Sequence, residues 1–90
     1  MKRSTQTITH GKKNIVGKNI RAIRLSKNLS QEELMAKLEV RGLHICNDSI
    51  CRIEKETRQV TDYEVMAIAY VLKVPVEKLF AGTDSIMNDE

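Results

Sequence analysis

Apolar residues recur every three or four positions along most of this chain, and no segment shows the strict alternation of a half-buried strand. In the first such segment, Ile15, Val16, Ile20 and Ile23 fall on one side of a helical projection, and basic residues fall off that side. The pattern predicts an amphipathic helix over residues 14–27.

A capping box follows this segment. Ser30 precedes Glu33 by three residues, so each side chain can bond the backbone N–H of the other residue. A second helix is predicted to start here. It is predicted to end near residue 41, because Gly42 can adopt the left-handed conformation that closes a helix.

A second capping box, Thr61 with Glu64, precedes the longest apolar stripe of the chain. At helical spacing this stripe predicts the most buried helix, and its side chains are predicted to form core rather than a cofactor pocket. Its residues are Val65, Met66, Ile68, Ala69, Val71 and Leu72.

Two shorter helices complete the pattern. Ile50 and Ile53 give residues 46–56 an inward-facing pair at helical spacing. The residues that can cap this helix are Cys46, Asn47 and Asp48. Pro75 suits the first turn of a fifth helix, because that turn does not need the N–H that proline lacks. The inward residues of the fifth helix are predicted to be Val76, Leu79 and Phe80.

At 90 residues the chain is one small domain, with 41% hydrophobic and only 3% aromatic residues. Length, composition and periodicity predict an all-α fold, a compact five-helix bundle in which a tight turn joins the second and third helices. No apolar run approaches the roughly 20 residues of a membrane-spanning helix, and the N-terminus lacks the apolar centre of a secretory signal. A cytoplasmic protein is therefore expected.

Charge divides the chain into three parts. Residues 1–13 carry +4, residues 14–82 carry +2 and residues 83–90 carry −3, which gives the net charge of +3. The first part is basic and poor in apolar residues, so it is predicted to be a disordered arm, either available to an anionic partner or acting as a solubilising tail. The middle part is predicted to be the folded domain, and the last part a flexible acidic tail.

Three stretches occur in a fixed order along about residues 14–81. They read IRAIRLSKNLSQEEL, ICNDSICRIEKETRQVTD and YEVMAIAYVLKVPVEKLF. This ordered set resembles the phage-repressor (Cro-like, XRE-type) helix-turn-helix DNA-binding family, and it is hard to meet by chance in so short a chain. The resemblance implies a lambda-repressor-like domain whose third helix lies in the DNA major groove, while the second helix crosses the DNA backbone.

The resemblance also assigns roles to individual residues. The implied base-contacting residues are Asn47, Asp48, Ser49 and Arg52, and the implied phosphate-contacting residues are Ser30, Gln31 and Arg58. Arg24 and Glu54 match a pair that bridges the first and third helices in this family. They are implied to form a structural ion pair.

Three features depart from the family pattern. Glu56 stands where a glycine often closes the third helix, so either this residue is strained or the turn differs. The stretch EVRGLHI is about three residues longer than the usual turn, which predicts an extended second helix. Phosphate repels Asp48, so this residue either accepts a bond from cytosine or caps the third helix.

His44, Cys46 and Cys51 raise the question of metal or redox chemistry. Their spacing lacks the paired ligands of a structural zinc site, and two thiols five residues apart point about 140° away from each other on a helix. No metal, cofactor or disulfide is therefore predicted. Oxidation of Cys46, whose thiolate a helix N-terminus favours, is a minor hypothesis.

These features together favour a transcription regulator, a repressor that occupies a palindromic operator as a homodimer. An edge formed by Val74, Val76 and Phe80 is one candidate for the dimer surface. The alternative is a protein-interaction module such as an antitoxin, because helical domains of this shape are reused for that purpose. An enzyme acting on a small-molecule substrate is not expected, since the sequence offers no nucleophile paired with a base and no glycine-rich phosphate loop.

Overall fold

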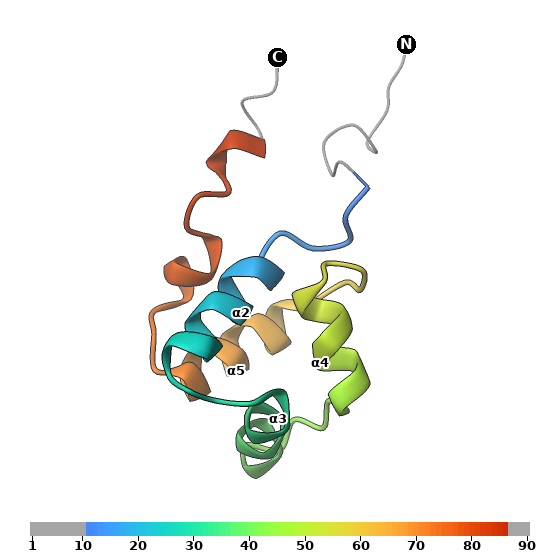
Figure 1. The fold of residues 1–90 in the computed structure, drawn as a ribbon, viewed down its shortest axis with the longest axis vertical. Coiled ribbons are helices and arrows are strands. Elements are labelled where there is room, and N and C mark those ends of the chain that lie inside the picture. The colour runs from blue at the N-terminus through green and yellow to red at the C-terminus, as the bar shows by residue number, and fades with distance from the viewer. Residues whose placement is uncertain (1–10, 87–90) are drawn as a thin grey trace.

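The computed structural model describes residues 11–86, and within this range all regular structure is helical. The α-helices are numbered as in Figure 1 and comprise α2 (Gly17–Ser26), α3 (Gln31–Val40), α4 (Asn47–Glu54) and α5 (Asp62–Leu72). Two 3₁₀ helices follow, η1 (Val76–Phe80) and η2 (Asp84–Ile86). The predicted all-α class is confirmed. None of the helices within residues 11–86 is long and apolar enough to cross a membrane.

Both predicted capping boxes are formed. The Ser30 hydroxyl accepts from the Glu33 N–H at 3.0 Å, and the Glu33 carboxylate accepts from the Ser30 N–H at 2.8 Å. Thr61 and Glu64 make the equivalent bonds at 3.1 and 3.0 Å. Each box satisfies two of the backbone donors that a helix N-terminus leaves free. This explains why α3 begins directly after Ser30 and α5 directly after Thr61.

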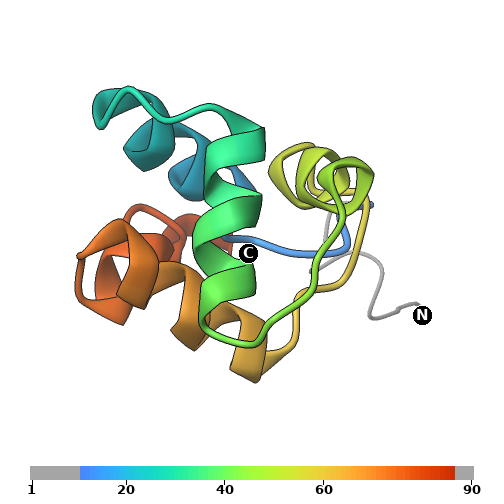
Figure 2. The same cartoon turned by 90° about the horizontal axis from the view of Figure 1, so that it is seen from below.

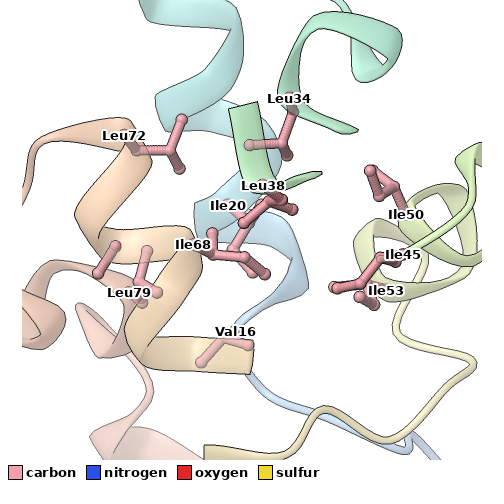
Figure 3. Packing of buried hydrophobic residues seen from close by; sticks show 11 residues of the cluster. Val16, Ile20, Leu34, Leu38, Ile45, Ile50, Ile53, Ile68, Leu72 and Leu79 are labelled. Carbon is pink, nitrogen blue, oxygen red and sulfur yellow. The ribbon is translucent and has the colours of Figure 1, made fainter. Parts of the chain in front are cut away.

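One apolar core lies between the helices (Figure 3). α3 packs against both α4 and α5, and α2 also contacts both of them (Figure 2). The buried apolar residues are Val16, Ile20, Leu34, Leu38, Ile45, Ile50, Ile53, Ile68, Ala69, Leu72 and Leu79. Each α-helix and η1 therefore supplies at least one side chain to the same core.

The α5 stripe is buried only in part. Ile68, Ala69 and Leu72 are buried as predicted, but Met66 is 63% exposed. Met66 lies two residues before Ile68, about 200° around the helix, so these two side chains cannot face the same core. The prediction that Met66 belongs to the core was wrong.

The connection between α3 and α4 is longer than predicted. α3 ends at Val40 and Gly42 has a φ of 88°, which confirms the predicted end of the helix. Residues 41–46 then lead to α4, so the extra length lies in the connection and not in an extended helix. The tight turn and the extended second helix were both wrong. Ile45, only 5% exposed, anchors this connection in the core.

The chain forms only the 3₁₀ helix η1 where a fifth helix was predicted, and Pro75 precedes η1 in an extended conformation instead of lying in its first turn. Its Lys78 N–H donates to the Pro75 carbonyl at 3.0 Å, the three-residue spacing of a 3₁₀ turn. Leu79 is fully buried, whereas Phe80, predicted to face inward, is 40% exposed. At three residues per turn Val76 and Leu79 share the face that packs against the core, whereas Phe80 lies about 120° away from that face.

The predicted terminal segments lie mostly outside the described residues. Residues 1–10, which include His10, and residues 87–90 are not described. Within the predicted arm, Lys12 Nζ lies 2.8 Å from Glu56 Oε1, and the Lys13 N–H donates to the Glu56 carbonyl at 2.9 Å. This part of the arm is therefore attached to the end of α4.

Asn14 joins the start of α2 to the end of α4. Its side-chain oxygen accepts from the Val16 and Gly17 N–H groups at 3.0 and 2.8 Å, so it occupies donors that the first turn of α2 leaves free. Its side-chain nitrogen donates to the carbonyls of Ile53 and Arg58 at 3.1 and 2.8 Å. The predicted first helix therefore begins at residue 17 instead of residue 14, because Asn14 serves as a bridge.

Gly17 permits the close approach of these two helices. A Cβ atom at this position would lie 2.1 Å from the Ile53 carbonyl oxygen and 2.9 Å from Glu56 Cγ. The first of these contacts is with backbone, which cannot move aside as a flexible side chain would. Any side chain at position 17 would push α2 away from α4.

We predict that Gly17→Ala lowers the free energy of unfolding by about 2 kcal/mol, because overpacking outweighs the better helix propensity of alanine. Urea denaturation of the purified chain measures the change. Lys18→Ala, at an exposed neighbouring position, is the control and is expected to shift stability by less than about 0.5 kcal/mol. Equal or greater stability of Gly17→Ala would contradict the close contact.

Candidate nucleic-acid interface

α4 has an apolar inner face and a polar outer face. Ile50 and Ile53 are each 1% exposed and lie in the core. The residues exposed on α4 are Asn47, Asp48 and Arg52, while Ser49 and Cys51 are half-buried. Three of the four implied base-contacting side chains therefore face solvent, and the fourth, Ser49, is partly accessible.

Asp48 is paired with Arg52. The Asp48 carboxylate lies 3.1 Å from Arg52 Nε, one helical turn away, and both side chains are more than 60% exposed. An exposed pair of this kind contributes little to stability, about 0.3–0.5 kcal/mol, but it restricts the directions in which Arg52 extends. The N-cap residue of α4 is Cys46, without a side-chain cap bond, so Asp48 does not take the capping role.

Cys46 lies against Ser49 at the start of α4. Its thiol donates to the Ser49 hydroxyl at 3.3 Å, and the Ser49 side chain and backbone N–H lower the pKa of this thiol. Cys46 and Cys51 are both free thiols. Within residues 11–86 no group of three or more His, Cys, Asp and Glu side chains is placed to hold a metal ion.

The predicted ion pair between Arg24 and Glu54 is formed and buried. Arg24 Nε and Nη2 donate to the two carboxylate oxygens of Glu54 at 2.7 and 2.9 Å. The bond to Glu54 raises the pKa of the Arg24 guanidinium. Arg24 Nη1 also donates to the Leu29 carbonyl at 2.7 Å, so the pair fixes α2, the following connection and α4 together.

Gln31 extends this network to α3. Its side-chain nitrogen donates to Glu54 Oε1 at 3.0 Å, so the carboxylate accepts from both Arg24 and Gln31. The neighbouring Ser30 is held in its capping box with Glu33. Both residues implied to contact phosphate at the start of α3 therefore also have structural bonds.

Arg58, implied to contact phosphate, has another partner. Its Nη1 and Nη2 donate to the two oxygens of Glu64, each at 3.0 Å, and Nη1 also donates to the Gln59 carbonyl at 2.9 Å. Arg58 lowers the pKa of Glu64, and Glu64 is also the capping residue of α5. The pair therefore holds the connection after α4 against the start of α5. Sequence reasoning missed it because Glu64 was already assigned to its capping box.

Glu56 closes α4 in a left-handed conformation. Its φ is 64° and it is only 6% exposed, which confirms the strained alternative at this non-glycine position. Besides its contact with Lys12, its carboxylate accepts from the Lys18 N–H at 3.4 Å. These contacts offset the cost of about 1–2 kcal/mol that the left-handed conformation imposes on a residue with a Cβ atom.

No protein-family model matches this chain, and no curated protein matches it. The similarity to phage repressors therefore stays a prediction from the sequence.

We predict that Glu54→Ala lowers the free energy of unfolding by about 3–5 kcal/mol, because it leaves the Arg24 guanidinium buried without its carboxylate. Thermal unfolding followed by circular dichroism measures the loss. Glu32→Ala removes an exposed glutamate from α3 and serves as the matched control, with a change below about 0.5 kcal/mol. A melting temperature unchanged by Glu54→Ala would show that the pair has no structural role.

A second prediction concerns acid stability. The pKa of Glu64 is lowered on folding, so its contribution is present above its ordinary pKa of 4.5 and is lost as the pH falls through the lower, folded value. Wild-type stability is therefore expected to fall with decreasing pH in this range. Glu64→Gln is expected to be less stable at neutral pH and to lose less on acidification. Urea denaturation at several pH values from neutral to strongly acidic measures the free energy of unfolding of both proteins as a function of pH. The same pH dependence in both proteins would contradict the assignment of this effect to Glu64.

Proposed function

We propose that this chain is a sequence-specific DNA-binding protein that represses transcription by occupying an operator. The observation that carries the proposal is the two-sided character of α4. Asn47 and Arg52 are exposed on it, while Ile50 and Ile53 hold its other side in the core. An α-helix of this kind fits a DNA major groove, which is about 12 Å wide.

The exposed side chains suit base recognition. The amide of Asn47 can pair with N6 and N7 of adenine, and the guanidinium of Arg52 with O6 and N7 of guanine. Asp48 contacts Nε of Arg52, which leaves the two terminal nitrogens for a base. We therefore assign Asp48 the role of orienting Arg52, and Ser49 a contact to a base or to a phosphate.

The start of α3 suits a phosphate. Backbone N–H groups and the helix dipole favour an anion there, and Ser30 and Gln31 lie at this position. Gln31 uses one of its two amide hydrogens on Glu54, so the other can reach a phosphate oxygen. In this proposal α3 and α4 act as a helix-turn-helix with a lengthened connection.

The proposed DNA-bound form is a homodimer. Two copies of α4 would read the two halves of a pseudo-palindrome, with half-sites about 34 Å apart, one helical turn of DNA. One symmetric dimer would thereby double the base contacts that a single eight-residue α4 can supply.

A second candidate is a protein-interaction module of the antitoxin type. The pairing of Asp48 with Arg52 favours it, since the carboxylate reduces the positive charge of the outer face of α4. A salt titration separates the two candidates. DNA affinity must fall log-linearly with salt concentration, with a slope of about −0.9 for each phosphate neutralised, whereas affinity for a protein partner need not.

We predict that Arg52→Ala weakens binding to the preferred duplex by about 1–3 kcal/mol and relaxes preference at one base pair, while Gln31→Ala weakens binding to every duplex alike. Selection from random DNA identifies the preferred duplex, which is expected to be palindromic. Fluorescence anisotropy then measures the affinity of each variant.

Arg21→Ala is the matched control, since Arg21 is exposed on α2. Circular dichroism of each variant verifies that the fold is retained. Equal losses on all duplexes for Arg52→Ala would contradict its assignment to a base. Failure of the wild-type chain to enrich any sequence would contradict DNA recognition itself.

A further inference from the structure

The outer face of α5 is aromatic and apolar. Tyr63 is 80% exposed, and Met66 and Tyr70 are each 63% exposed. At spacings of three and four residues these side chains form one row along the helix, the α5 row. A contiguous row of large apolar side chains on a small domain marks an interaction surface.

The C-terminal end of α3 forms one flank of the α5 row. The Arg41 guanidinium lies 4.2 Å from the centroid of the Tyr70 ring. Arg41, Tyr63, Met66, Ala67 and Tyr70 line a shallow, open depression of about 350 Å³.

The two ends of α5 carry charges of opposite sign. Asp62 begins α5 and Lys73 follows its last residue. Lys73 has left-handed backbone angles, φ 61° and ψ 44°, so helical spacing does not set the direction of its side chain, and only its position at the opposite end of α5 from Asp62 is fixed. Within residues 11–86 neither of them forms an ion pair with another side chain.

We infer that a second copy of this chain packs against the α5 row, with its own α5 running antiparallel. This inference rests on the proposed homodimer and names its surface. A two-fold axis across α5 brings Asp62 of each copy to Lys73 of the other, which forms two ion pairs. It also brings Tyr63 of each copy toward the Tyr70 and Arg41 end of the other. The surface is thus complementary to itself, as a two-fold interface requires.

The area of this surface indicates a weak dimer. Tyr63, Met66 and Tyr70 of two copies together expose about 900 Å², just below the roughly 1,000 Å² at which specific interfaces begin. The dimer is therefore expected to dissociate in the micromolar range when no DNA is bound.

This pairing also suits the proposed DNA complex. In an antiparallel, face-to-face helix pair the two-fold axis lies in the contact plane and perpendicular to the helices. A two-fold rotation leaves directions along its axis unchanged, so the α3 flanks of both copies lie on the same side of the dimer. Figure 1 shows α3 and the start of α4 at the same end of the molecule, and Figure 2 shows α3 between α4 and α5. Both copies of α4 would then lie on one side of the dimer, where one DNA duplex can meet them.

The edge predicted from the sequence offers less surface. Phe80 is 40% exposed, and Val74 and Val76 are half-buried against the core. We therefore assign the dimer surface to the α5 row. A dimer formed instead through Val74, Val76 and Phe80 is the competing outcome of the test.

Sedimentation equilibrium of the full chain without DNA, from about 1 to about 500 µM, tests the inference. The wild-type chain is expected to dimerise. Met66→Glu places a charge at the centre of the contact and is expected to weaken dimerisation at least tenfold. Leu25→Glu, which adds the same charge at an exposed apolar position on α2, is the control and is expected to leave it unchanged.

A charge exchange makes the test specific to the antiparallel arrangement. Asp62→Lys and Lys73→Asp are each expected to weaken dimerisation several-fold, and the double variant is expected to restore it. Circular dichroism verifies that each variant is folded. A wild-type chain that stays monomeric at about 500 µM overturns the inference. A dimer that survives Met66→Glu but is lost in Phe80→Glu also overturns it, as does a double variant without recovery.

Because this measurement contains no DNA, the two proposals fail separately. A monomeric chain that still selects a DNA sequence overturns only the α5 surface. A chain that dimerises through α5 but selects no sequence overturns only DNA recognition.

Discussion

The buried pair of Arg24 and Glu54 is the interaction on which the position of α4 depends. α4 has eight residues, too few to be stable as a helix alone, so its place is set by what holds its inner face. Ile50 and Ile53 attach it to the core, but apolar contacts are not directional. The bidentate ion pair, joined by Gln31, adds direction, because a fork of two hydrogen bonds admits a narrow range of orientations. The outer face of α4 is thereby fixed relative to the start of α3.

The end of α4 is held in a second, independent way by the segment before α2. Asn14 bonds the carbonyls of Ile53 and Arg58, and the absence of a side chain at Gly17 lets the two backbones approach. Glu56 adopts a left-handed conformation, with its carboxylate bonded to Lys12 and to the backbone of Lys18. A short helix that ends in such a turn cannot rotate without breaking several of these bonds. The C-terminal end of α4 is therefore constrained from two directions, which suits a surface whose side chains must meet fixed positions on a partner.

The fold separates two surfaces of different chemistry. α3 packs against both α4 and α5, so the polar outer face of α4 and the apolar α5 row come from helices on different sides of it. The α4 face offers hydrogen-bonding groups that can distinguish partners, whereas the α5 row offers dispersion, stacking and a pair of opposite charges. A small domain can use both at once, because neither surface takes its exposed residues from the other helix. In this arrangement the proposed association of two copies and the proposed recognition of DNA would be coupled only by geometry.

The sequence alone determined the all-α class, both capping boxes, the end of α3 at Gly42 and the partnership of Arg24 with Glu54, the last through a family resemblance. The class and the capping boxes depend on spacings of three or four residues, and the end of α3 depends on the left-handed conformation that glycine adopts easily, so local geometry fixes all three wherever the chain folds. Tertiary structure decided what depends on neighbours distant in sequence. It exposed Met66, because α5 is apolar on more sides than its neighbours cover. It paired Arg58 with Glu64. It also placed the extra residues before α4 in a connection anchored by Ile45, and it brought Asn14 and Gly17 into contact with the end of α4. Apolar periodicity shows which side of a helix can be buried, but only packing decides which helix covers it and which polar group meets which partner.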